Sequence, residues 1–225
     1  MRWGEKPTFP LLHQMEGSLA DNLSANFSLG ISPTLFPDFE THEVLDTLQT
    51  ISFVMGVPTL SQADKKAVSK AVYNIEHKLL SMEWAQKDLY AYHESQLSPL
   101  SYAFTLAALL YLEVMIREHP YISKVHSRIS FKLHTLLSES NPSWYGSGSL
   151  PYRDVLLWIM FVKVVTSPPD VRDLCIAFPD NAEIEETTKE SLRGRLKRIA
   201  WRDKICDYHL DRIWRELINH ESIGP

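Results

Sequence analysis

The sequence of 225 residues is poor in cysteine and in glycine. Its two cysteines, Cys175 and Cys206, form no Cys-x-x-Cys pair, which is too few for a disulfide scaffold or a zinc module and favours a reducing compartment. The eight glycines fall below the usual share of about 7%. Few segments alternate polar with apolar residues, so the sequence predicts helices and no convincing pair of strands.

Excess positive charge and long apolar runs are also missing. The formal net charge of −5 argues against a chain that wraps nucleic acid through bulk electrostatics. The longest apolar runs, 103–112 and 155–162, are shorter than the roughly 20 residues of a membrane span. The opening stretch, MRWGEKPTFP, lacks the apolar run of a signal peptide. We therefore expect a protein that stays inside the cell and has no membrane partner.

The rest of the chain reads as an all-α protein. Residues 1–37 show no sustained period, which indicates an irregular arm or a linker remnant, and residues 38–220 are predicted to form one helical domain. Helix-start signals include a capping box at Ser61 and Asp64 and a first-turn proline, Pro99. The fold class is a single multi-helix bundle of about eight helices, with predicted ranges 38–55, 61–82, 98–119, 122–137, 151–166, 170–177, 181–206 and 208–219.

Two helical segments, 102–116 and 155–165, are apolar on every face. A helix tolerates this pattern only when neighbours surround it, so these two are predicted to be fully buried central helices. Each carries one charge, Glu113 or Lys163, and a buried ion costs several kcal/mol unless it is paired. Our hypothesis places Lys163 near Asp203 or Asp207, or near Glu113.

Asp203 and Asp207 belong to the stretch AWRDKICDYHLDRIW, residues 200–214, which reads as helix. At about 100° per residue, both carboxylates project into an apolar stripe. Two close carboxylates could share a proton or bind a metal ion. The structural interpretation is favoured, with Asp207 as an N-cap and Asp203 paired with an arginine or with Lys163. The stripe consists of Leu196, Ile199, Cys206, Leu210, Ile213, Trp214, Leu217 and Ile218.

Other candidates for chemistry are weaker. Adjacent members of the series His119, His126 and His134 lie about 10–12 Å apart along a helix, too far for one metal ion. Cys206 and His209 could be two ligands, but structural zinc needs four. The loop YGSGSLP lacks the Lys-Ser/Thr pair of a phosphate loop, and neither a nucleophile elbow nor a dinucleotide fingerprint is present. We expect no catalytic residue, no cofactor, no metal ion and no enzyme activity.

A basic run near the C-terminus has two interpretations. It could bind nucleic acid or phosphate, or it could match the dipole of a helix that opens with acidic residues. The dipole interpretation is favoured because it explains both ends of the helix. The basic residues are Arg193, Arg195, Lys197, Arg198, Arg202 and Lys204, and the acidic ones are Asp180, Glu183, Glu185 and Glu186.

Three larger side chains, Trp201, Ile205 and Tyr208, lie opposite the apolar stripe on the same predicted helix. Either this side of the helix is also buried, or it forms a surface that binds a partner or a ligand. A hydrophobic pocket would be one form of such a surface. Core packing is the favoured interpretation.

Four blocks carry a resemblance to a known family: VYNIEHKLLSMEW, LAALLYLEVMIREHP, LLWIMFVKVV and LKRIAWRDKICDYHLDRIWREL. With these blocks the chain resembles the fungal-specific transcription factor domain, a helical regulatory region that usually follows a binuclear zinc-cluster DNA-binding module. The likeness spans roughly residues 68–218. Its closing signature corresponds to Trp201, Asp203, Cys206, Asp207, Ile213 and Trp214.

The resemblance implies a transcriptional regulator, often of metabolic genes, in the nucleus; without it, a cytoplasmic location is expected. A zinc cluster needs six closely spaced cysteines, so direct DNA contact through such a cluster is not expected. The regulator would instead act through a protein partner, as a homodimer or through a small-molecule effector. The resemblance also implies that Asp203 and Asp207 cap a helix and form ion pairs. The alternative is a helical small-molecule-binding protein, or an enzyme, that reuses this scaffold.

Overall fold

All regular secondary structure in the described residues is helical. The computed structural model describes residues 36, 38–88, 98–118, 123–139, 150–167 and 188–221, and no strand occurs in these ranges. The all-α class is therefore confirmed, whereas the count of about eight helices is corrected to seven α-helices in the described part. They are α2 (Phe39–Gly56), α3 (Gln62–Asp88), α4 (Pro99–Tyr111), α5 (Lys124–Glu139), α7 (Leu150–Thr166), α9 (Lys189–Lys197) and α10 (Asp203–Glu221), and a π-helical turn, η2 (Leu112–Ile116), extends α4.

Local capping sets several helix starts. The backbone N–H of Asp64 donates to Ser61 Oγ at 3.1 Å, and the backbone N–H of Ser61 donates to Asp64 Oδ2 at 3.2 Å, which confirms the capping box. Pro99 occupies the first turn of α4, as predicted. Asp38 caps α2 and also accepts a hydrogen bond from Ser101 Oγ at 2.6 Å. This bond ties the start of α2 to the first turn of α4.

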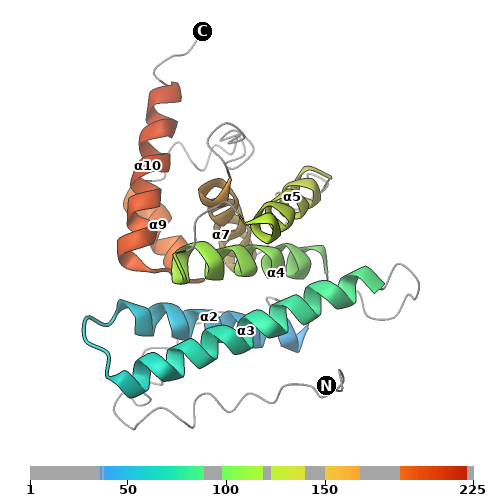
Figure 1. Cartoon of the computed structure of the whole chain (residues 1–225). Helices are drawn as coiled ribbons and strands as arrows, with labels where there is room; N and C mark the ends of the chain where they lie inside the picture. The colour runs from blue at the N-terminus through green and yellow to red at the C-terminus, as the bar shows by residue number, and fades with distance from the viewer. Residues whose placement is uncertain are drawn as a thin grey trace.

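Helix α4 lies between two groups of helices (Figure 1). It contacts α2 and α3 on one side and α5 and α7 on the other, and every side chain from 103 to 112 is buried. The stretch Pro99–Ile116 has the length and apolarity of a membrane span, with a mean hydropathy of 1.6, yet 83% of it is buried inside the protein. Neighbouring helices thus already cover the apolar surface of this helix.

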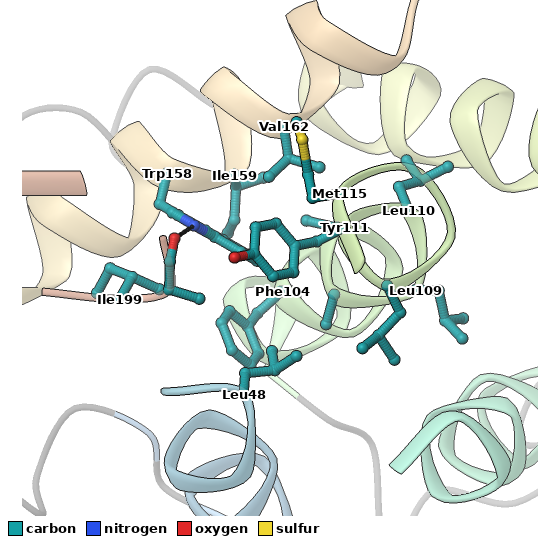
Figure 2. Close-up of a cluster of buried hydrophobic side chains, with 14 of the residues drawn as sticks. Leu48, Phe104, Leu109, Leu110, Tyr111, Met115, Trp158, Ile159, Val162 and Ile199 are labelled. Atoms are coloured by element: carbon teal, nitrogen blue, oxygen red, sulfur yellow. Dashed lines mark hydrogen bonds between the residues drawn. The ribbon is translucent and has the colours of Figure 1, made fainter. Parts of the chain in front are cut away.

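Aromatic side chains join α4 to α7 (Figure 2). The indole ring of Trp158 lies 5.5 Å from the ring of Phe104 and 5.3 Å from the ring of Tyr111, centroid to centroid. All three side chains are fully buried, and tilted aromatic pairs at this spacing add to the free energy gained from burial. The Nε1–H of Trp158 donates a hydrogen bond to the carbonyl of Ala200, outside this cluster, at 2.8 Å.

That hydrogen bond marks a helix boundary that the sequence did not reveal. The predicted helix over 181–206 ends at Lys197 within the described part, and α10 begins at Asp203, four residues before Asp207. We call the intervening residues 198–202 the α9–α10 junction. No proline or glycine occurs in it, so local sequence gave no break signal. The predicted irregular arm, residues 1–37 apart from Phe36, and the predicted helix 170–177 lie outside the described ranges.

Candidate functional site

The α9–α10 junction forms hydrogen bonds with three other elements. Besides the indole of Trp158 on α7, Gln49 Nε2 on α2 donates to the carbonyl of Arg198 at 2.6 Å. The guanidinium of Arg202 donates to the carbonyls of Met115 and Ile116 at 2.8 and 3.4 Å, at the end of η2. The bonds from Trp158 and Gln49 satisfy the carbonyls of Ala200 and Arg198, where the regular helical hydrogen bonds are interrupted.

Arg202 also closes the end of the α4–η2 helix. Its Nη2 lies 2.7 Å from the carboxylate of Glu118, a non-glycine residue with φ of 55°. A residue in this left-handed conformation just after a helix is a common C-terminal cap, and an arginine beside the last carbonyls complements the helix dipole. The side chain of one junction residue therefore holds the terminus of a different helix.

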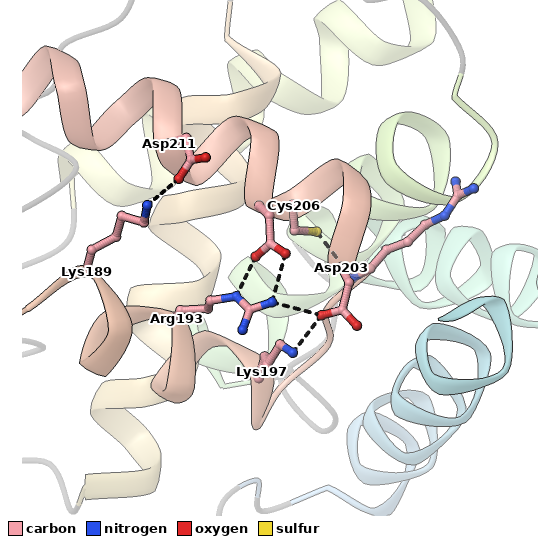
Figure 3. A network of polar contacts seen from close by, with 8 residues as sticks. Lys189, Arg193, Lys197, Asp203, Cys206 and Asp211 are labelled. Carbon is pink, nitrogen blue, oxygen red and sulfur yellow. Dashed lines mark hydrogen bonds and ion pairs between the residues drawn. The ribbon is translucent and has the colours of Figure 1, made fainter. Parts of the chain in front are cut away.

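The paired carboxylates of Asp203 and Asp207 bind basic side chains of α9 (Figure 3). Arg193 makes a two-pronged contact with Asp207, with Nε at 2.5 Å and Nη2 at 2.8 Å from its two oxygens. Asp203 accepts from Arg193 Nη2 at 3.3 Å and from Lys197 Nζ at 2.6 Å. The hydrogen bond to Asp207 raises the pKa of Arg193, the direction expected for a stabilised guanidinium.

This geometry confirms the predicted pairing with an arginine and corrects two other details. Asp207 does not cap a helix start, because it lies one turn inside α10. Neither carboxylate is buried in the apolar stripe, since the side chains of Asp203 and Asp207 are 57% and 34% exposed. Five of the eight apolar positions of the stripe belong to the core, and Trp214 packs half-buried against it, whereas the side chains of Leu217 and Ile218 lie outside the part that the structure describes. The five are Leu196, Ile199, Cys206, Leu210 and Ile213.

Lys163, the other predicted partner, is buried on α7 and so does not point into solvent. Arg193 and Lys197 contact the two aspartates, and Arg117 Nη1 lies 3.4 Å from Glu113. A contact of Lys163 with one of the three carboxylates stays a prediction.

The basic run is engaged in ion pairs between elements. Arg195 Nε and Arg198 Nη1 bind the two oxygens of Asp154 on α7, at 2.7 and 2.8 Å. With the contacts of Arg193, Lys197 and Arg202, five of the six basic side chains bind carboxylates within the fold. Arg195 and Lys197 do lie in the last turn of α9, in line with the dipole interpretation. The dipole interpretation did not include the ion pairs between elements. The four acidic residues at the predicted helix start, within 180–186, lie outside the described ranges.

Sequence reasoning missed Asp154, which is the most buried carboxylate of this network at 2% side-chain exposure. The only signal was its place at the edge of an apolar helical run, where an acid needs a partner. Gln49 and Ser52 on α2 were missed too. Nothing local distinguishes them from ordinary polar residues on a helix.

The buried polar groups near the junction are held in their neutral forms. Burial raises the pKa of the Cys206 thiol to about 12 and raises the pKa of Tyr111 well above its usual range. The hydroxyl of Tyr111 lies 3.0 Å from Ser52 Oγ. A thiol that stays protonated is a poor nucleophile and a poor metal ligand, so Cys206 acts here as a small apolar side chain.

The candidate metal ligands do not assemble in the described part of the chain. No group of three or more His, Cys, Asp and Glu side chains lies close enough there to hold a metal ion. His126 and His209 are both buried, His134 is half-buried, and His119 is outside the described ranges. Burial lowers the pKa of His126.

A cleft of about 600 Å³ lies between α2 and the junction. Its walls are mainly apolar, with Phe53 on one side and Trp201 on the other. Trp201 is only 7% exposed, and its ring packs 5.4 Å from that of Phe161, so core packing is confirmed for this residue. Tyr208 is instead 62% exposed, which contradicts core packing at that position. The cleft is lined by Gln49, Ser52, Phe53, Gly56, Val57, Pro58, Lys197, Ile199, Ala200, Trp201 and Asp203.

No known protein family, curated protein or solved structure matches this chain. The site thus has to be interpreted from its own geometry. It consists of two ion-paired aspartates, a junction hydrogen-bonded to three other elements, and an adjoining cleft with few polar groups.

Proposed function

We propose that this chain is the helical regulatory domain of a transcriptional regulator similar to the fungal-specific transcription factors, without a zinc cluster of its own. It would control metabolic genes in the nucleus through a protein partner, a second copy or a bound ligand, and would be cytoplasmic if it had no such role. We also propose that α4 and α7 form the central pair of one bundle over residues 38–220.

The α9–α10 junction is the observation that supports this proposal best. The residues that carry the resemblance have structural roles in the junction and in the first turns of α10: Trp201 and Cys206 are buried, and Asp203 and Asp207 form ion pairs with α9. A catalytic signature would be expected to bring reactive groups together in a pocket, whereas these four residues pack in the core or form ion pairs.

The outer face of α3 favours a protein partner. Tyr73, Leu80 and Trp84 are 63%, 42% and 63% exposed, and their spacing of seven and four residues places them along one side of the helix. A line of large apolar side chains on the surface marks an interaction site more often than a solvated face. A partner helix with an apolar stripe would cover it.

A tethering assay tests the proposed function. The whole chain is fused to a heterologous DNA-binding domain, and a reporter gene with the matching operator is measured against the DNA-binding domain alone. We expect the reporter to change, and we expect a fluorescently tagged chain to enter the nucleus. An unchanged reporter with a soluble, nuclear fusion at equal abundance would overturn the proposal.

A mobility-shift assay with the untethered chain tests how it reaches DNA. We expect no salt-sensitive shift of duplex DNA, because five of the six basic side chains in the run are bound within the fold. A shift that weakens as salt rises would show instead that the chain contacts DNA by itself.

The cleft beside the junction favours one alternative, a helical protein that binds a small molecule without any role in transcription. A cleft of about 600 Å³ has the size of many ligand sites. The tethering assay distinguishes the two functions, because only a regulator would change the reporter signal.

A further inference from the structure

We propose that the cleft between α2 and the α9–α10 junction binds a small apolar molecule that carries one anionic group, such as an aromatic or long aliphatic carboxylate. This inference deepens the proposed function, because it names the effector site that a regulator would use. Binding itself can be measured without reference to transcription.

The apolar part of the ligand follows from the walls of the cleft. Phe53 of α2 is 41% exposed and lines the cleft, as do Ile199 and Trp201 of the junction. Val57 and Pro58, which follow α2, line the same space. A flat or extended hydrocarbon group that fills this space would remove apolar side-chain surface from water, which is the main source of affinity in such sites.

Two donors define the anionic end. The indole Nε1–H of Trp201 is buried and has no hydrogen-bond partner among the described residues. An unsatisfied buried donor costs free energy that a ligand oxygen would recover once the ring turns slightly to meet it. Lys197 also lines the cleft, together with its ion-pair partner Asp203, and is the one basic residue among the described residues that line it.

Lys197 can bind a ligand anion without leaving an acid unpaired. Its present partner, Asp203, also accepts a hydrogen bond from Arg193 at 3.3 Å. If Lys197 turned toward a carboxylate in the cleft, Asp203 would therefore keep one basic partner. The ligand would contact both α2 and the junction, so its binding would fix the position of α10 relative to α2.

The chain offers a matched pair of variants to test this site. A Cβ atom added at Gly56, which lines the cleft, or at Gly194, which lies on α9 outside it, meets no heavy atom within 4 Å. Gly56→Trp should fill the cleft, whereas Gly194→Trp adds the same side chain elsewhere. Far-UV circular dichroism and a urea titration establish that both variants fold.

The probe is 1-anilinonaphthalene-8-sulfonate, an aromatic anion whose fluorescence rises in apolar sites. We expect the whole chain to bind it at one site, Gly56→Trp to weaken binding about tenfold or more, and Gly194→Trp to leave it within about twofold. Decanoate should displace the dye. Equal dye affinity in the wild-type chain and Gly56→Trp, or no binding to the wild-type chain, would overturn the proposal.

A second measurement tests the anionic end and does not depend on Gly56→Trp folding. Lys197→Gln and Trp201→Phe should each weaken the sulfonate dye more than the uncharged dye N-phenyl-1-naphthylamine. Equal losses for both dyes in both variants would refute the role assigned to these donors. Dye binding in the cleft without any reporter effect of Gly56→Trp would count against the proposed function alone.

Discussion

Removing the buried negative charge of Asp154 should destabilise the protein more than removing any other acid of the α9–α10 network. Asp154→Asn keeps the shape of the side chain and replaces one acceptor oxygen by an amide. One of the two arginine contacts, at 2.7 and 2.8 Å, is then lost and the other becomes a weaker, neutral hydrogen bond. The substitution therefore acts on charge and leaves the packing of α7 unchanged.

The expected magnitude comes from the burial of each partner. A hydrogen bond to a charged group contributes about 1.5–3 kcal/mol and a neutral one about 1 kcal/mol. The side chain of Arg198 is 55% exposed and can return to water, which reduces the loss, whereas that of Arg195 is only 25% exposed. We expect Asp154→Asn to lower the free energy of unfolding by about 2 kcal/mol, or the melting temperature by about 4–8 °C for a chain of this length.

Asp203→Asn is the matched control, because it removes the same charge from a side chain that is 57% exposed. Exposed ion pairs contribute about 0–1 kcal/mol and are screened by salt. Urea titrations at pH 7, followed by circular dichroism in low and high salt, measure both variants. A loss for Asp203→Asn equal to or larger than that for Asp154→Asn would refute the assignment of Asp154 as the main electrostatic link between α9 and α7.

Three further predictions concern single residues. Because burial lowers the pKa of His126, the unfolded chain takes up its proton first, so stability should fall as the pH drops below about 6.5, and a pH series of urea titrations should show a smaller slope for His126→Gln. Burial raises the pKa of Cys206 from 9.0 to about 12, so its thiol should form about a thousandfold less thiolate at neutral pH. In a Cys175→Ser chain, where Cys206 is the one remaining thiol, a thiol reagent should therefore react no faster than the chain unfolds. Gly194→Ala should raise the free energy of unfolding by about 0.5–1 kcal/mol in a urea titration, because the added methyl group meets no neighbour and alanine favours a helix; a loss of stability would show that α9 is strained there.

Local signals in the sequence predicted most helix starts correctly. The capping box at Ser61 and Asp64 and the first-turn proline Pro99 act within one turn, so the sequence alone contains the necessary information. The burial of Cys206 and Leu210 also followed from spacing, since one face of a helix must meet the core.

The α9–α10 junction could not be predicted in this way. Its hydrogen bonds come from Gln49 and Trp158, which lie 149 and 42 residues away from their acceptors along the chain. The pairing of Arg193 with Asp207 could not be predicted either, because any of six nearby basic side chains could have been the partner before the positions of the helices were known. The sequence therefore predicted a basic partner for Asp203 and an N-cap role for Asp207, and the tertiary structure decided that Arg193 binds both.

The hydrogen bond from Gln49 to the carbonyl of Arg198 has a consequence for how the protein assembles. It joins the first described helix to the last two, so loop closure over most of the chain has to precede it. Contacts of such long range slow folding, because the entropy of closing a long loop is lost before the contact stabilises the chain. During synthesis, the contact between Gln49 and Arg198 can form only after residue 198 has left the ribosome, when all the helices before it have already been made.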